Sequence, residues 1–359
     1  MVLSHALKNI FILLVLENNL RLPAEWEPQS AVLIAWPHPN TDWNYMLPEV
    51  TKCFQQIAAA ILDDEDLIVA APGDLLAIAD TIESNKKFRL HAFSVPTNDT
   101  WARDFGPITM LSPSGSPVLL NFVFNAWGMK FAANLDNLIT PTLDMLGAFD
   151  CPIEDHLDFV LEGGSVESDG KGCILTTEEC LLSVNRNGHL SQEEIECHLK
   201  RVFNASKVIW LRNGALAGDD TDSHIDTLAR FAPDNTILYV GCDNPADEHF
   251  VGLQAMEKEL REATNAAGQP FRLIKLPFPD PVFDEDGLRL PATYANFLIT
   301  NHSVLVPTYA QPENDARALE LIASAFPGRK MVGIDCRALI KQHGSLHCVT
   351  MQLPVGVIS

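Results

Sequence analysis

The sequence predicts an α/β fold of repeated modules, and two features of its hydrophobic pattern support this prediction. Short runs of consecutive apolar residues, typical of strands buried on both faces, alternate with stretches whose apolar residues lie three or four positions apart, as on one face of a helix. The alternation returns about every 60–70 residues, with a helix and two or three strands each time. Such a repeat indicates a ring or array of like modules, in which each module can send one loop to a common centre.

The first elements follow one another closely. The continuous apolar run at 31–36 predicts a buried strand, and helical spacing from Tyr45 to Ile61 predicts the helix after it. A second buried strand is expected at 67–71, then a helix at 75–82. The alternation of apolar and polar residues at 89–95 predicts a strand with one exposed face.

The later part of the chain repeats this pattern. Helices are predicted at 135–146, 191–202, 250–260 and 316–326. Ser191 and Glu194 form a capping box at the start of the second of these helices. Two hairpins are also predicted, the first pairing 173–176 with 180–183 and the second pairing 297–300 with 303–306.

Composition limits the class of protein. The chain has 359 residues, of which 47% are hydrophobic and 20% charged, so it can bury a substantial core. A formal net charge of −22 argues against a nucleic-acid partner. The same charge favours cationic ligands mildly, although acidity for solubility alone is the commoner explanation.

The cysteines and the N-terminus bear on location. Eight cysteines are spread along the chain without a C-x-x-C pair, as is typical of reduced thiols in a cytoplasmic protein. The apolar run at 10–16 is too short for a membrane span and precedes no small-residue cleavage site. We therefore expect an N-terminal extension at 1–20, one domain at 21–359, and a cytoplasmic location.

Four stretches carry more charge and glycine than their apolar flanks require, namely 98–107, 161–165, 218–226 and 342–351. Together they offer a thiol, an imidazole, several carboxylates and indole rings. Carboxylates bind a guanidinium through charge-assisted hydrogen bonds, and an indole face adds a cation–π contact. A thiol with an imidazole supplies the nucleophile and the acid that attack on a guanidinium carbon requires.

Each of these residues also has an ordinary structural explanation when taken alone. Cys348 is one of eight thiols, most of which are expected in the core, and His224 could be a hydrogen-bonded structural histidine. Asp220, Asp222, His224 and Asp226 occupy alternate positions, so an extended segment would direct all four to one side as metal ligands. No H-E-x-x-H, G-x-G-x-x-G or P-loop pattern accompanies them, so neither a metal nor a nucleotide cofactor is expected.

Taken together, these stretches resemble the agmatine deiminase family and its bacterial peptidyl-arginine-deiminase-like relatives, from about Arg21 to Pro354. The residues that carry the resemblance lie in eight segments, in this order: Leu22–Trp26, Asn98–Asp104, Phe124–Gly128, Leu161–Ser165, Asn185–Asn187, Asp220–Asp226, Pro291–Asn296 and Gly344–Cys348.

The resemblance implies a pentein fold, a single-domain pseudo-fivefold α/β propeller around a central site. It also implies roles at the matching positions. Cys348 would attack the guanidinium carbon, and His224 would protonate the departing ammonia and then activate water. Asp104 and Asp226 would hold the guanidinium nitrogens.

Further residues of the matching segments would bind the substrate. The resemblance implies that Glu162 is an additional carboxylate of the cluster and that Trp101 and Trp127 wall the channel, with Gly128 beside them. Ser223 departs from the family, in which glycine commonly precedes the histidine. The segment 36–43 departs as well, and recognition of the substrate tail is expected there.

These residues lead to a predicted function. The expected enzyme is an agmatine deiminase that uses no cofactor and releases N-carbamoylputrescine and ammonia. Its expected partner is a small cationic guanidino substrate, with no nucleic acid and no membrane, and homo-oligomerisation is left open. The alternatives are a peptidyl-arginine or free-arginine deiminase, a metal-binding protein or metallohydrolase built on Asp220–Asp226, and a silent binder of guanidino compounds.

Overall fold

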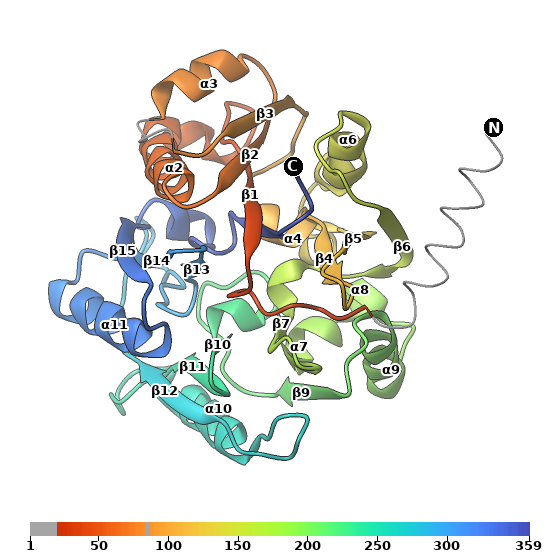
Figure 1. Cartoon of the computed structure of the whole chain (residues 1–359). Coiled ribbons are helices and arrows are strands. Elements are labelled where there is room, and N and C mark those ends of the chain that lie inside the picture. The colour runs from red at the N-terminus through yellow and green to blue at the C-terminus, as the bar shows by residue number, and fades with distance from the viewer. Residues whose placement is uncertain (1–19, 83–86) are drawn as a thin grey trace.

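Five β-sheets surround a common centre in the computed structural model, which describes residues 20–82 and 87–359, and the longer helices lie on the outside (Figure 1). The longer helices are α2 (Leu47–Leu62), α3 (Leu75–Thr81), α6 (Ile139–Met145), α9 (Gln192–Val202), α10 (Phe250–Glu262) and α11 (Pro312–Ala325). The short α-helices are α4 (Ala102–Phe105), α5 (Ala126–Met129), α7 (Glu178–Leu181) and α8 (Val184–Asn187). Short 3-10 helices are η1 (Asp42–Met46), η2 (Asp136–Leu138), η3 (Gly163–Ser165), η4 (Ile225–Thr227) and η5 (Leu339–Gln342).

Four of the sheets share one topology. In each, the first strand pairs antiparallel with the second, and the second pairs parallel with the third. Their strands are β4 (Ile108–Leu111), β5 (Pro117–Val123), β6 (Ile153–Val160), β7 (Glu167–Ser168), β8 (Cys173–Thr177), β9 (Lys207–Leu211), β10 (Ala229–Ala232), β11 (Thr236–Val240), β12 (Arg272–Leu276), β13 (Leu298–Ile299), β14 (Ser303–Thr308) and β15 (Lys330–Asp335). The repeated modules predicted from the sequence are therefore confirmed.

The fifth sheet joins the two ends of the described chain. It has the order β16-β1-β2-β3, with β1 (Gln29–Ala35), β2 (Asp66–Ala71), β3 (Leu90–Ser94) and β16 (Met351–Pro354). The last strand, β16, pairs antiparallel with β1 and so supplies the strand that each other module takes from its own sequence. This pairing closes the ring and fixes the loop before β16, which carries Cys348, at the centre.

Burial explains why the apolar runs become strands. Residues 31–35 of β1 are fully buried, because β1 has a strand on each side and α2 packs near the same sheet through Phe54, Ile57 and Ile61. The predicted helices and the hairpin of β13 with β14 are confirmed, as is the capping box of Ser191 and Glu194.

The hairpin predicted between 173–176 and 180–183 is wrong. The first stretch is β8, which pairs with β7 and β9, and residues 178–181 form α7. The Thr177 side chain accepts a hydrogen bond from the Cys180 backbone N–H and so starts a helical turn where a hairpin return would have to begin.

The predicted extension at 1–20 lies outside the described residues apart from Leu20. Among the helices of residues 20–82 and 87–359, none has the length and apolar character that a membrane span requires.

Candidate active site

A small cavity of about 30 Å³ lies at the centre of the ring. Residues of three polar stretches, 98–107, 218–226 and 342–351, line it. Trp101, Trp127 and Phe131 supply its aromatic walls, and Cys348 lies among the lining residues. The two indole rings meet edge to face, with centroids 6.5 Å apart. The cavity is therefore a narrow aromatic channel that ends at a thiol.

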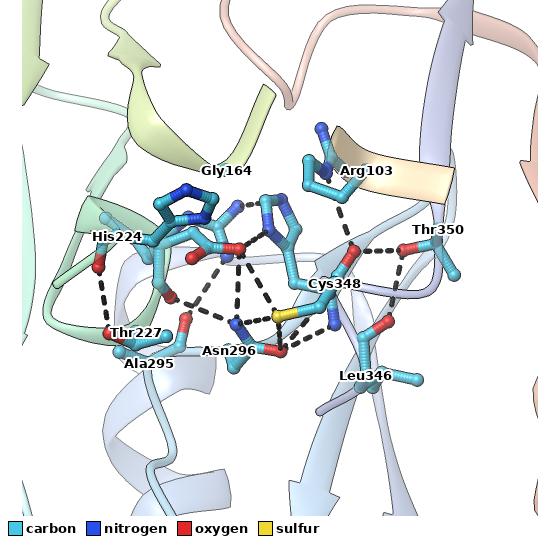
Figure 2. A network of polar contacts seen from close by, with 12 residues as sticks. Arg103, Gly164, His224, Thr227, Ala295, Asn296, Leu346, Cys348 and Thr350 are labelled. Atoms are coloured by element: carbon cyan, nitrogen blue, oxygen red, sulfur yellow. Dashed lines mark hydrogen bonds and ion pairs between the residues drawn. The ribbon is translucent and has the colours of Figure 1, made fainter. Parts of the chain in front are cut away.

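The loop before β16 brings Cys348 to this channel. A side chain on Gly344 would place its Cβ 2.1 Å from the Trp101 ring, so only glycine allows the loop to pass so close to the indole. Asn296 Nδ2 lies 3.2 Å from the Cys348 sulfur and Asp226 Oδ2 3.7 Å from it. Figure 2 shows the Asn296 side chain directly against this sulfur.

The cysteine is held as a thiol in the absence of a ligand. Its side chain is buried, and burial together with the negative charges of Asp226 and Asp104 raises the pKa of Cys348 well above its ordinary value. A cation placed in the channel would oppose these effects and favour the thiolate.

His224 faces the same centre, where each of its ring nitrogens makes a long ion-pair contact with a carboxylate. Nδ1 lies 3.6 Å from Asp104 Oδ1 and Nε2 lies 3.9 Å from Glu162 Oε2, and neither nitrogen has a hydrogen-bond partner although the ring is buried. Burial works to lower the pKa of His224, but Asp104, Cys180 and Glu162 outweigh it and raise the pKa well above the usual value. The resting ring is thus an imidazolium.

The backbone around His224 is fixed by neighbouring hydroxyl groups. The His224 N–H donates to Thr221 Oγ1. Thr227 Oγ1 donates to the His224 carbonyl, as Figure 2 shows. Left-handed backbone at Asp222 and Ser223 turns the loop immediately before the histidine. This turn directs the imidazole inward instead of along an extended strand.

Asp104 approaches from the short helix α4. Its Oδ2 accepts a hydrogen bond from Trp127 Nε1 at 2.9 Å, and its Oδ1 accepts one from the Gly164 N–H at 3.0 Å. Burial, opposed by His224 and assisted by Asp226, raises the pKa of Asp104 to about 6. A Cβ on Gly164 would lie 2.6 Å from His224 Nδ1 and 2.8 Å from Asp104 Oδ1, so glycine is required where these two groups converge.

Asp226 presents one satisfied and one free oxygen. Its Oδ2 is 2.7 Å from His347 Nδ1 and 3.3 Å from Asn296 Nδ2, whereas its buried Oδ1 has no hydrogen-bond partner. Burial works to raise the pKa of Asp226, but the hydrogen bond from His347 and nearby positive charges lower it. One carboxylate oxygen and two imidazole nitrogens thus lie unpartnered beside a thiol, as expected of a site built to receive a polar ligand.

Comparison with known proteins identifies the family. The model of the Porphyromonas-type peptidyl-arginine deiminase family matches residues 21–354. This protein belongs to that family. A candidate agmatine deiminase of Marinomonas sp. is 33% identical over 94% of this chain and 95% of its own length.

Solved structures of similar proteins place this deiminase-family chain in the pentein fold. A candidate arginine deiminase of Porphyromonas gingivalis is 53% identical, with a TM-score of 0.89 over 95% of this chain and 99% of its own. A substrate-bound variant of C. jejuni agmatine deiminase is 37% identical, with a TM-score of 0.87 over 94% of this chain and 97% of its own. The five-module propeller predicted from the resemblance is confirmed, and the family consists of hydrolases of guanidino groups.

The structure of this deiminase-family protein brings most of the predicted site residues together. Cys348, His224, Asp104 and Asp226 converge, and Trp101 and Trp127 line the channel. Two predicted binding residues have other contacts.

Glu162 accepts hydrogen bonds from Arg186 Nε on both oxygens, at 2.9 Å each, and is completely buried. Gly128 is absent from the channel lining; it has φ +84°, and a Cβ there would lie 3.1 Å from Asn185 Cβ. Glu162 is therefore oriented by an arginine behind the imidazole, and Gly128 serves the backbone turn that carries Trp127.

The alternating segment Asp220–Asp226 does not form the predicted extended row of ligands. It contains left-handed residues and runs into η4, so its side chains diverge. Asp222 pairs with Arg186 and Lys130, while Asp220 lines the channel. Within the described residues, the groups that bring three potential ligand atoms together are Glu162–Cys180–His224 and Glu25–Glu167–His347, and neither contains Asp220 or Asp222.

Three residues near the site were not assigned a role from the sequence. Asn296 lies in a segment that carries the resemblance, and its contact with the sulfur could have been suspected from that position alone. His347 precedes the nucleophile, and Glu25 lies in the first matching segment, far away in sequence. Only the folded chain shows that these two side chains meet, with His347 Nε2 2.9 Å from Glu25 Oε1.

Proposed function

We propose that this protein is an agmatine deiminase, which hydrolyses agmatine to N-carbamoylputrescine and ammonia through a covalent adduct on Cys348. The observation that carries the proposal is the convergence of a buried thiol, an imidazolium and the free Oδ1 of Asp226 at the end of an aromatic channel. A guanidinium placed there would donate hydrogen bonds to Asp104 and Asp226 and bring its carbon to the sulfur.

The first half of the reaction forms the adduct. Entry of the cation lowers the pKa of Cys348, and the thiol releases its proton to solvent, since His224 is already protonated. The thiolate attacks the guanidinium carbon, forming a carbon–sulfur bond. His224 then donates its proton to one terminal nitrogen, the carbon–nitrogen bond breaks, and ammonia leaves an S-alkylthiouronium cation.

The second half hydrolyses the adduct. The now neutral His224 takes a proton from water as the oxygen attacks the thiouronium carbon. The carbon–sulfur bond breaks, and the proton of the new hydroxyl group goes to the departing sulfur. This step restores the Cys348 thiol and the His224 imidazolium and releases the ureido product.

The channel mouth supports agmatine over free arginine. Asp42, Asp99 and Asp220 line the channel, and no lysine or arginine is among its lining residues. These carboxylates suit the second cation of agmatine and would repel the α-carboxylate of arginine. The Asp42 carboxylate belongs to the segment 36–43, where tail recognition was expected from the sequence.

The two arginines in the segments that carry the resemblance, Arg186 and Arg103, could pair with the α-carboxylate of arginine only if they were free, and both are already engaged. Arg186 is paired with Glu162 and Asp222, and its side chain is fully buried. Arg103 is hydrogen-bonded to Glu25 and Gln352 and lines a different cavity. Neither is in a position to recognise a carboxylate in the channel.

A second candidate is deimination of arginine or of arginyl peptides. It is supported by the peptidyl-arginine deiminase family model and by the 53% identity with the candidate arginine deiminase of Porphyromonas gingivalis. In a peptide the α-carboxylate is not free, so the acidic mouth opposes this substrate less strongly than it opposes free arginine.

The test is ammonia release in EDTA from agmatine, arginine and a blocked arginyl peptide, with Cys348→Ser as the matched control for each. Release from agmatine alone, abolished in the variant, is the expected result. Release only from arginine or the peptide would agree with the thiol mechanism but would show that agmatine is not the substrate. Activity that persists in Cys348→Ser would contradict the covalent mechanism.

A further inference from the structure

Asp226 is held from the side opposite its free oxygen by the residue that precedes the nucleophile. His347 Nδ1 lies 2.7 Å from Asp226 Oδ2, the shortest of the polar contacts that Asp226 makes, and both side chains are about 1% exposed. Cys348 lines the channel, whereas the His347 ring faces away from it toward Glu25. Two consecutive residues thus contact Asp226, one with its sulfur and one with its ring.

The charges around His347 determine which nitrogen carries a proton. Burial, Arg103 and Arg230 lower the pKa of His347, which favours the neutral ring. Nε2 lies between a donor, Arg230 Nη2 at 3.0 Å, and an acceptor, Glu25 Oε1 at 2.9 Å, whereas Nδ1 faces only the carboxylate of Asp226, which can only accept. The proton is then on Nδ1, where it is donated to Asp226 Oδ2.

A group of charged and polar side chains, buried apart from the half-buried Glu25, keeps the ring in this orientation. We name it the rear cluster: Glu25, Arg103, Glu167, Arg230, His347 and Gln352. Glu25 accepts hydrogen bonds from Arg103, Arg230 and Gln352, and Arg230 also donates to Glu167 and to two backbone carbonyls. The ring therefore cannot turn without breaking charge-assisted hydrogen bonds.

We propose that His347, oriented by Glu25 and Arg230, is a positioning residue for the reaction: its Nδ1–H fixes Asp226 Oδ2 so that Oδ1 faces the guanidinium. Asp226 Oδ1 makes no hydrogen bond, so the carboxylate would rotate toward the nearest donor unless its other oxygen were held in place. The proposal rests on the proposed function only in requiring a guanidinium or amidinium group beside Cys348.

Two substitutions of His347 separate its two nitrogens. The amide nitrogen of His347→Asn occupies the place of Nδ1 and can still donate to Asp226, whereas that of His347→Gln takes the place of Nε2 and cannot. On whichever of agmatine, arginine or arginyl peptide the wild type turns over, we expect kcat/KM to fall about 10- to 100-fold further in His347→Gln than in His347→Asn.

The pH profile supplies a readout that a merely structural role would not move. Loss of the Nδ1–H donor raises the pKa of Asp226 from its lowered value, so protonation of Asp226 is added to that of Asp104 and the acidic limb of kcat/KM becomes steeper in His347→Gln but not in His347→Asn. The other charged or titratable groups that face Asp226 are His224, Asp104, Arg230 and Cys348, and they are identical in both variants.

A labelling experiment makes the test independent of the natural substrate. 2-Chloroacetamidine is an amidinium cation that alkylates a thiol, and 2-chloroacetamide is its neutral counterpart. Mass spectrometry gives the rate at which each compound alkylates Cys348. The ratio of the cationic to the neutral rate measures how strongly Asp226 favours a cation beside the sulfur. We expect this ratio to fall at least tenfold in His347→Gln and about twofold in His347→Asn.

Equal losses in the two variants, or a larger loss in His347→Asn, would overturn the proposal, because the ring would then serve only to fill space or to pair Glu25. If neither variant folds, Glu25→Gln provides the same test. Its amide can donate to His347 Nε2 and so keeps the proton on Nδ1. A labelling ratio within about threefold of wild type supports the proposal, and a loss of tenfold or more rejects it.

Discussion

His347 and Cys348 are neighbours in sequence, yet they belong to two regions with opposite electrostatic character. On the channel side, His224 and Asp226 have buried polar atoms that make no hydrogen bond, and the pKa of Asp104 is raised to about 6. In the rear cluster, Arg230 uses its donors on Glu25, Glu167 and backbone carbonyls. The two regions meet at the shared contact with Asp226.

The channel side contains the groups that destabilise the folded state, and the rear cluster contains the ion pairs that offset this loss of stability. Unpartnered buried polar groups and like charges destabilise the folded state, and they persist where a ligand completes them. A saturated ionic cluster directly behind them holds the same backbone in place. Substitutions on the channel side should therefore affect rate more than stability. Substitutions in the rear cluster should do the reverse, except at His347, which contacts Asp226 directly.

The largest expected effect is on the rate, at His224. His224→Ala removes the proton donor and acceptor, so kcat should fall about 10²- to 10⁴-fold while the free energy of unfolding is unchanged or increases. The matched control is His249→Ala, because His249 is also buried but both of its nitrogens are bonded, to Asp247 and to the Ala217 N–H. That variant should lose about 1–3 kcal/mol of stability and retain kcat. Steady-state kinetics and urea unfolding of both variants would show a reversed pattern if the contrast were wrong.

The next effect is on stability, in the rear cluster. Arg230→Met leaves the buried Glu167 and the half-buried Glu25 without their main counter-ion, so the free energy of unfolding should fall by about 3–5 kcal/mol. Arg212→Met is the control, since Arg212 pairs with Glu178 at the surface and its side chain is 69% exposed. Its loss should be at most about 1 kcal/mol in the same urea titration. Similar losses in the two variants would mean that the rear cluster contributes little.

A smaller effect concerns pH and the channel mouth. Burial and the nearby Asp42 raise the pKa of Asp99 to about 7, so this carboxylate loses its charge as the pH falls through 7. Binding of agmatine to the Cys348→Ser variant should then weaken about fivefold between pH 8 and pH 6, as expected for a charge pair worth about 1 kcal/mol. Calorimetry would measure the dissociation constant. With Asp99→Asn added, the affinity should be lower at pH 8 and its pH dependence smaller, because only Asp104 and Asp220, with pKa values raised to about 6, then lose charge in this range. An unchanged pH dependence would assign the effect to another group.

The two regions also differ in how far the sequence could predict them. The strands and helices followed from uninterrupted or helically spaced apolar residues, and the channel residues lie in short polar stretches that stand out against such flanks. Glu25, Glu167 and Arg230 are single charges far apart in the chain, and nothing local distinguishes them from surface residues. Their pairing brings together β7, β10 and the segment before β1, and no local pattern specifies that these segments meet.

The remaining errors have local causes. Alternation at Asp220–Asp226 suggested an extended segment because periodicity does not reveal a left-handed residue, and two such residues occur there without glycine. The predicted hairpin after residue 173 failed because both stretches are apolar and short, a pattern that a buried helical turn satisfies equally well.

The smallest expected effect is at Ser223, which has φ +62° where glycine would be unstrained. Ser223→Gly should relieve about 1 kcal/mol of backbone strain and lose a hydrogen bond of similar worth, from Oγ to Glu179 Oε2 at 2.7 Å. Stability should thus change by less than about 1 kcal/mol and kcat by less than about twofold, because the Ser223 N–H still donates to Asp219.

Asp222→Gly sharpens the comparison, since Asp222 has nearly the same backbone conformation, with φ +63°. Its side chain pairs with Lys130 and with Arg186, the residue that orients Glu162 behind His224. Removing it should lower kcat clearly more than Ser223→Gly does, by about tenfold, although the relief of backbone strain is the same. Equal kinetics in the two variants would show that the loop acts only through its backbone and that the link through Arg186 has no part in placing the imidazole.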